Sequence, residues 1–136
     1  MTVAVVQGHA VGAGFQLALA CDLRVLADDA RLSLREVSLG LVPDLGGTKP
    51  LVELAGPARA LEIAATGRWV DAAEAERIGL ANVVAGADAL DDAVRDLVAS
   101  LLAPPAGAVR AVTGLMRGAA ERTAQAARLR DLAGLS

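Results

Sequence analysis

The sequence contains very few aromatic, cysteine and histidine residues. Phe15 and Trp69 are its only aromatic residues and its net charge is −3, so it lacks the stacking side chains and the basic surface that are typical of nucleic-acid-binding proteins. Its single cysteine, Cys21, excludes an internal disulfide, and its apolar neighbours predict a buried small hydrophobe rather than a nucleophile. Its single imidazole, His9, has no acidic or cysteine neighbour, which argues against a metal site or a catalytic triad.

Long apolar runs and a leader-like N-terminus are also lacking. The longest uncharged apolar run, residues 11–21, is too short to cross a bilayer and is interrupted by two glycines and a glutamine. The first residues contain neither a basic segment nor a small-residue cleavage site. We therefore expect a cytoplasmic protein with no membrane and no nucleic-acid partner. The 54% hydrophobic content over 136 residues is sufficient for the core of one domain.

The segment 3–22 combines an apolar strand, closely spaced glycines and the start of a short helix. Gly8, Gly12 and Gly14 allow a tight turn and a close approach of the backbone to a ligand. The helix that opens near Gly14 presents free N–H groups and the positive end of its dipole, which together can stabilise an oxyanion. The glycine spacing breaks the dinucleotide-binding fingerprint, and residues 46–49 lack the Gly-Lys-Ser/Thr of a P-loop, so neither nucleotide motif is indicated.

Three segments follow one another in a fixed order. Residues 8–22 are similar to the pattern Gly-x-Ala-x-Gly-Gly-Gly-x-Glu-Leu-Ala-Leu-Ala-x-Asp, and residues 36–48 to Glu-x-x-Leu-Gly-x-x-Pro-x-x-Gly-Gly-Thr. Residues 67–84 look like Gly-Arg…Ala-x-Glu-Ala…Gly-Leu-Val-x-x-Val. Together these segments resemble the crotonase family, the enoyl-CoA hydratase/isomerase proteins, over about residues 3–84.

Strands that alternate with helices predict an α/β fold. Strands are expected at residues 3–7, 23–27, 32–34 and 81–84, and helices at residues 14–21, 49–54, from 57, 71–79, 88–103, 109–120 and 124–132. The resemblance implies a partial crotonase-like core, the spiral shared by ClpP and crotonase, in residues 1–86, and a helical C-terminal region in residues 87–136. In this family that region commonly mediates trimer contacts, so we expect a homotrimer or hexamer, or assembly with a complementary crotonase chain.

Two departures from the family pattern affect the expected function. The chain starts at the strand that enters the first glycine turn, so about the N-terminal third of a usual crotonase is expected to be missing. That third supplies one of the two oxyanion N–H donors and much of the coenzyme A-binding surface. In addition, Gln16 occupies the position of one of the two hydratase glutamates, and its amide can orient water but cannot exchange a proton near neutral pH.

The resemblance implies that Glu36 is the catalytic acid and base. The matching glutamate of the family faces the acyl chain beside the thioester, where a carboxylate can remove the α-proton and return it elsewhere once the enolate oxygen is held by N–H donors. Asp44, which follows Pro43, is a second candidate acid. Its alternative role is to cap the amides of the glycines at 46 and 47.

The thioester oxygen is expected to bind at residues 12–14. The backbone N–H of Ala13, flanked by Gly12 and Gly14, would supply the oxyanion donor. Alanine replaces a glycine of the family here, so it could resist the backbone conformation of the turn. We expect no metal and no cofactor other than the coenzyme A that forms part of the substrate.

The predicted function is that of an acyl-CoA thioester enzyme of the enoyl-CoA hydratase/isomerase type, which acts through an oxyanion-stabilised enolate. The family favours a hydratase, whereas Gln16 favours an isomerase or a decarboxylase, and the sequence leaves this choice open. The competing interpretation is a catalytically inactive, truncated chain that binds a partner, because missing strands would leave a sheet edge and apolar faces uncovered. The glycine turn lacks the nucleophilic serine of the related Clp proteases, which disfavours proteolysis.

Overall fold

The computed structural model of the chain describes residues 1–134, without the side chains of residues 123, 124, 127, 130 and 131. Residues 1–96 form one compact unit, and the helical residues from 97 onward form a second. The strands are β1 (Val3–Val6), β2 (His9–Val11), β3 (Leu23–Ala27), β4 (Arg31–Ser33), β5 (Val70–Asp71) and β6 (Val83–Ala85). The helices are α1 (Ala13–Ala20), the 3₁₀ helix η1 (Arg35–Leu39), α2 (Thr48–Ala55), α3 (Pro57–Thr66), α4 (Ala72–Arg77), α5 (Leu90–Leu102) and α6 (Ala106–Leu132).

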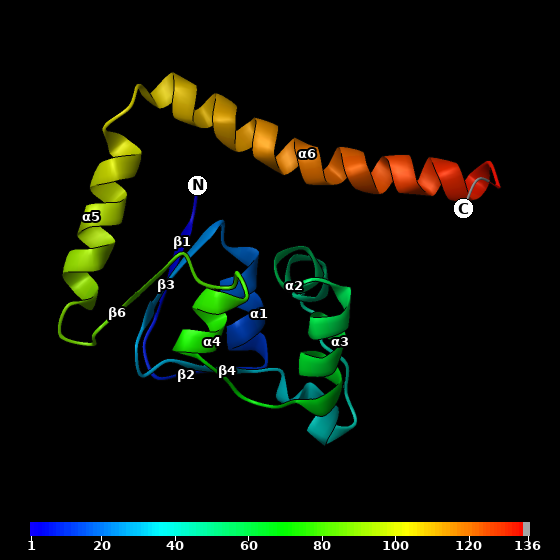
Figure 1. Cartoon of the computed structure of the whole chain (residues 1–136), viewed down its shortest axis with the longest axis horizontal. Coiled ribbons are helices and arrows are strands. Elements are labelled where there is room, and N and C mark those ends of the chain that lie inside the picture. The colour runs from blue at the N-terminus through cyan, green and yellow to red at the C-terminus, as the bar shows by residue number, and fades with distance from the viewer. Residues whose placement is uncertain (135–136) are drawn as a thin grey trace. The chain divides into compact units, whose positions relative to one another are not determined.

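The strands of the first unit form two small sheets (Figure 1). One sheet has the order β1-β3-β6, and its neighbouring strands are parallel. The other has the order β2-β4-β5, with β2 parallel to β4 and β5 antiparallel to β4. Parallel neighbours need crossover connections, which explains why helices separate the strands along the chain. The prediction of an α/β fold is confirmed.

Short sequence signals set the ends of most helices, as expected. Gly56, at a φ of 85°, ends α2, and Pro57 then opens α3. Asp71 caps α4, because its carboxylate accepts a hydrogen bond of 2.8 Å from the amide of Glu74. These local signals therefore fix the boundaries where the backbone must change direction.

Three elements of the first unit were not predicted. β2 lies inside the stretch that we expected to be a glycine turn: Gly8, at a φ of 69°, bends the chain after β1, and Ala10 is then buried as the middle residue of a second strand. The 3₁₀ helix η1 and the two-residue strand β5 are too short to produce a periodic pattern in the sequence.

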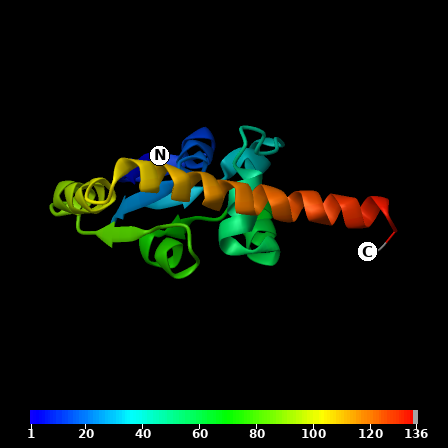
Figure 2. The same ribbon diagram turned by 90° about the horizontal axis from the view of Figure 1, so that it is seen from above.

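The core of the first unit is apolar and contains the single phenylalanine. Phe15 and Leu19 of α1 belong to the same buried cluster as the strand residues Leu26 and Leu32. In the view of Figure 2, the strands run between α1, drawn in blue, and α4, drawn in green. Burial from both sides explains why β3 is apolar along most of its length.

The described part of the second unit is helical except at residues 103–105 and 133–134. The predicted helices at 109–120 and 124–132 are in fact one continuous helix, α6, because residues 121–123 contain neither glycine nor proline to interrupt it. Among residues 1–134, no single helix is long and apolar enough to cross a membrane. Helix α5 and residues 106–122 of α6 meet these two criteria only when they are taken together, and the chain bends sharply between them.

Candidate active site

A cavity of about 380 Å³ lies beside the start of α1. It contains five of the six residues that the sequence singled out: Gly12, Ala13, Gln16, Glu36 and Asp44. The elements that bring them together are α1, η1 and the loop between η1 and α2. The remaining lining is mostly apolar and consists of Val11, Arg35, Leu39, Leu41, Val42 and Leu45.

Glu36 lies in the first turn of η1 and is half-buried. One carboxylate oxygen, Oε1, accepts a hydrogen bond of 2.7 Å from Nε2 of Gln16. The other, Oε2, is buried and has no hydrogen-bond partner in the described structure. A buried carboxylate oxygen without a partner is costly. Oε2 is therefore the oxygen of Glu36 that the described protein groups leave unsatisfied.

Gln16 connects Glu36 to the loop in front of α2. Its side chain is only 1% exposed. Its Oε1 accepts hydrogen bonds from the amides of Leu45, at 2.8 Å, and Gly47, at 3.2 Å, while its Nε2 donates to Glu36. Both ends of this amide are thus engaged within the protein. Gln16 holds the carboxylate and the loop in one arrangement.

Gly47 is required by the close packing of this loop on α1. A Cβ added at Gly47 would lie 2.7 Å from Cγ of Gln16 and 3.2 Å from its Cα. A Cβ essentially never lies 2.7 Å from another heavy atom, so either the Gln16 side chain or the loop would have to move. The glycine pair at residues 46 and 47 indicated close packing in this loop, but it did not indicate that Gln16 is the residue against which Gly47 packs.

The backbone at Gly12 lies close to the carboxylate of Glu36, and Ala13 follows it along the cavity wall. Gly12 has a φ of 56° and precedes α1, and a Cβ added there would lie 3.4 Å from Oε1 of Glu36. Ala13 is the first residue of α1, and no described residue other than glycine has a positive φ, so the expected strain at this alanine is absent. The first N–H groups of a helix have no acceptor within it, which leaves the Ala13 amide suitable for an oxyanion.

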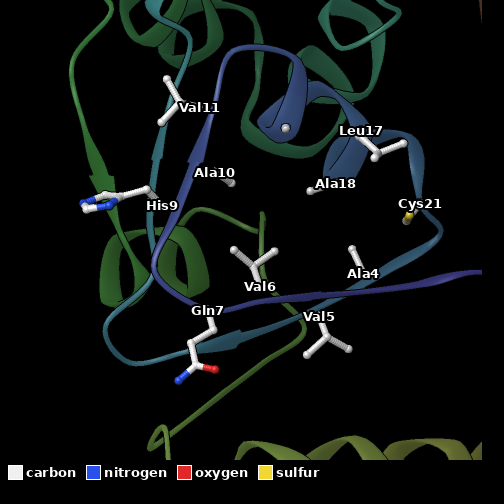
Figure 3. Close-up of a pocket in the computed structure, with 11 residues that line it drawn as sticks. Ala4, Val5, Val6, Gln7, His9, Ala10, Val11, Leu17, Ala18 and Cys21 are labelled. Carbon is white, nitrogen blue, oxygen red and sulfur yellow. The ribbon is translucent and has the colours of Figure 1, made fainter.

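Asp44 and Gly14 have different surroundings. Asp44 is exposed at the cavity and does not cap Gly47, since the Gly47 amide donates to Gln16 instead. Gly14 lines a second cavity of about 610 Å³ between α1, β1 and β2 (Figure 3). The structure therefore gathers the other candidates around Glu36 and places Gly14 on the neighbouring side of α1.

The only histidine and the only cysteine of the sequence, His9 and Cys21, line this second cavity. His9 is exposed, and its ring packs against Trp69 with centroids 5.3 Å apart. Cys21 is half-buried, so the prediction of a buried thiol was wrong. It ends α1 at the surface rather than in the core. Among the described residues, no group of three or more His, Cys, Asp or Glu side chains could hold a metal ion.

Arg35 is a cavity residue that the sequence did not single out. Its guanidinium also lies 6.0 Å from the Trp69 ring and donates weakly, at 3.4 Å, to the carbonyl of Gly67. It adjoins Glu36 in sequence, but an arginine in a polar turn has no distinguishing pattern. The sequence did not indicate the Leu45 amide either, because every residue except proline has a backbone N–H and the residue type does not show which of them binds Gln16.

Comparison with known proteins gives one consistent result. The family model described as Enoyl-CoA hydratase/isomerase matches residues 1–134. Carnitinyl-CoA dehydratase of Citrobacter koseri is 43% identical over 119 residues, which are 88% of this chain and 46% of that protein. Enoyl-CoA isomerase/hydratase claC of Penicillium crustosum is 46% identical over 91 residues, 67% of this chain and 10% of that protein.

Solved structures agree with these relatives. A candidate enoyl-CoA hydratase of Thermobifida fusca, crystallised with acetoacetyl-CoA, is 53% identical with a TM-score of 0.84, and the match covers 95% of this chain and 55% of that one. The chain thus spans about half the length of this protein and of the Citrobacter relative. The shared fold confirms the expected crotonase-like core.

Proposed function

Because the chain belongs to the enoyl-CoA hydratase/isomerase family, we propose that it acts on an acyl-CoA thioester through an enolate, with Glu36 as the group that moves the proton. The observation that carries this proposal is the buried, unpartnered Oε2 of Glu36 beside the first residues of α1. The acetoacetyl-CoA bound to the Thermobifida fusca relative supports a thioester of coenzyme A as the substrate.

The backbone at the start of α1 would hold the thioester oxygen. When a base removes the α-proton, the electron pair moves toward this oxygen, which then carries negative charge. The Ala13 amide and the helix dipole can stabilise that charge. Gly12, whose backbone lies against the Glu36 carboxylate, lets base and oxyanion donor occupy adjacent positions.

The apolar wall of the cavity suits an acyl chain. Leu39, Val42 and Leu45 line it and are 74%, 73% and 62% exposed. Large apolar side chains at a cavity mouth favour a hydrocarbon ligand over a polar one. We propose that they contact the acyl part of the substrate, while Asp44 at the rim remains the second candidate acid.

Double-bond migration, in which a single carboxyl group removes and returns one proton, suits this site better than hydration. In double-bond migration, Glu36 accepts the α-proton, the enolate forms, and the same carboxyl group returns that proton to the far carbon of the former double bond. Hydration also requires a water molecule to be deprotonated, and the Gln16 amide cannot accept that proton. Gln16 would act as a positioning residue that presents Oε2 of Glu36. Decarboxylation to an enolate is the alternative that needs the same groups.

The test is an assay with paired substrates and a matched variant. Conversion of a 3-enoyl-CoA to the conjugated 2-enoyl-CoA reports isomerisation, and loss of the conjugated enoyl thioester reports hydration. Glu36→Gln should lower turnover by about 100-fold or more and leave thioester binding nearly unchanged. Glu76→Gln, on the exposed side of α4, serves as the control. Full activity of Glu36→Gln would exclude Glu36 as the acid and base.

A further inference from the structure

One aromatic ring and several basic side chains meet on the face of the sheet β2-β4-β5 that points away from α1. His9 of β2 lies opposite Arg31 of β4 in the sheet register, and Trp69 immediately precedes β5. The His9 ring packs against the Trp69 ring with centroids 5.3 Å apart, and Cζ of Arg31 lies 5.0 Å from the centre of the same ring. In Figure 3, the His9 side chain points away from Ala10 and α1. The fold thus brings three separate segments of the chain together at one indole.

A second guanidinium group lies at the same indole. Arg35 follows β4, and its Cζ is 6.0 Å from the centre of the Trp69 ring. The weak bond of 3.4 Å to the Gly67 carbonyl is the one hydrogen bond that the described structure gives to this guanidinium. Stacking on an aromatic ring holds a guanidinium in place and leaves the N–H groups at its edge free to donate. Trp69 therefore positions two cationic groups whose donors are largely unused.

Among the described residues, neither of these arginines has a carboxylate partner. The ion pairs between described side chains involve neither Arg31 nor Arg35. Asp71 lies opposite Arg31 in the register of β4 and β5, but its carboxylate caps α4 by accepting the Glu74 amide. Both arginine side chains are also exposed. Two like charges at one ring repel each other, so a bound anion would relieve this repulsion.

The donors of this cluster match a phosphate group better than a carboxylate. Each guanidinium presents a planar fork of N–H groups that can bind two oxygen atoms at once, and the imidazole adds a further N–H donor. A phosphate monoester has three free oxygen atoms and a charge of about −2, whereas a carboxylate has two oxygen atoms and a single charge. Two arginine forks and an imidazole together exceed what one carboxylate can accept.

We propose that Arg31, Arg35 and His9, held around Trp69, bind a phosphate group, carried either by inorganic phosphate or by a small phosphate monoester. Arg35 also lines the cavity of Glu36, so the bound group lies at the edge of that cavity. The phosphates of coenzyme A are separated from its thioester by the whole pantetheine arm, and the ligand of this cluster is therefore a separate molecule. The proposal concerns binding and does not depend on Glu36 being catalytic.

The intrinsic fluorescence of the chain tests this proposal directly. Trp69 is the only tryptophan and the sequence contains no tyrosine, so the emission reports on this cluster. Titration with inorganic phosphate, at an ionic strength held constant with chloride, should give a saturable change in the millimolar range or below. Phenyl phosphate is titrated in the same way, and the tighter of the two ligands shows whether the site prefers the free ion or a monoester. Competition between coenzyme A and phosphate would overturn the assignment of a separate ligand.

Matched variants identify the groups that bind. Arg31→Gln and Arg35→Gln should each weaken phosphate binding by about tenfold, as expected for the loss of one charge-assisted contact. Arg31→Lys keeps the charge but loses the planar fork, so its affinity should lie between those of wild type and Arg31→Gln. Arg59→Gln removes an exposed arginine of α3 and should bind phosphate like wild type.

Isothermal titration calorimetry measures the same affinities without using fluorescence, and circular dichroism checks that each variant is folded. The absence of saturable phosphate binding to the wild-type chain by both methods would overturn the proposal. Folded Arg31→Gln and Arg35→Gln variants that bind phosphate as wild type does, or an equal loss of affinity in Arg59→Gln, would overturn it as well.

Discussion

Gln16 and Glu36 are joined by a hydrogen bond of 2.7 Å from the amide nitrogen of Gln16 to Oε1 of Glu36, although 20 positions separate them in the sequence. The amide oxygen of Gln16 accepts the N–H groups of Leu45 and Gly47. One buried side chain therefore sets both the orientation of the carboxylate and the path of the loop that closes the cavity.

Gln16→Glu should make folding stability strongly dependent on pH. The new carboxylate would be buried within hydrogen-bond distance of Glu36, and two carboxylates at this distance cannot both ionise without a large cost, so one pKa rises in the folded state. Such a group favours folding most below its unfolded pKa, and this benefit is lost as the pH rises through the folded pKa. We expect a larger loss of unfolding free energy at pH 8 than at pH 5, measured by urea denaturation.

The matched variant for this prediction is Gln16→Met. It removes the same hydrogen bonds without adding a charge, so its loss of stability should be similar at the two pH values. If the unfolding free energies of Gln16→Glu and Gln16→Met depend on pH in the same way, then the side chains at positions 16 and 36 are not within hydrogen-bond distance of each other, and the contact in the structure is contradicted.

Gly47→Ala should destabilise the fold by about 1–3 kcal/mol, the usual cost of overpacking. The added methyl group would lie 2.7 Å from Cγ of Gln16 and 3.2 Å from its Cα, which belongs to the helix backbone. Gly107→Ala, where an added Cβ meets nothing within 4 Å, is the control and should be neutral or slightly stabilising because alanine favours helix. Thermal unfolding of both variants checks this, and equal melting temperatures would contradict the packing at Gly47.

The ion pairs of Arg68 should make a small contribution to stability that disappears in acid. Arg68 donates to Glu74 at 2.7 Å and to Glu62 at 2.7 Å. The hydrogen bond from Arg68 lowers the pKa of Glu74 below its ordinary value of 4.5. A depressed pKa stabilises the fold above that ordinary value, and the benefit is lost as the pH falls through the lower, folded-state pKa.

The measurement compares wild type with Glu74→Gln at pH 7 and at pH 3. Because this pair is partly exposed, the difference at pH 7 should be about 1 kcal/mol or less, and it should shrink at pH 3. Glu76→Gln on the same helix should change little at either pH. A difference that grows toward pH 3 would contradict the sign of this linkage.

Helix α6 should mediate self-association of the chain. Val112, Leu115 and Met116 share one face at helical spacing and are 53%, 59% and 68% exposed. Leu115→Glu should reduce the mass measured by analytical ultracentrifugation, whereas Gln125→Glu, farther round the helix, should not. A wild-type chain that sediments as a monomer at high concentration would argue against this interface and against the expected trimer or hexamer.

The residue pattern of short segments determined much of this structure. Apolar strands, Gly56 followed by Pro57, and the Asp71 cap act within a few residues. The sequence therefore predicted β1, β3, both ends of α2 and the start of α3 closely. The ordered motifs also identified the family and the candidates around Glu36. Signals of this kind are local, because they arise from backbone conformation and helix capping.

Tertiary packing decided which groups meet. Only the folded chain brings Gln16 against Glu36 and Gly47, places Gly14 at a different cavity, and separates β1 and β2 into two sheets. These contacts join residues that are far apart in sequence, and their geometry depends on how helices and strands fill the core. No local pattern encodes such a distance, which is why the sequence named the residues of the site but not the hydrogen bonds that organise it.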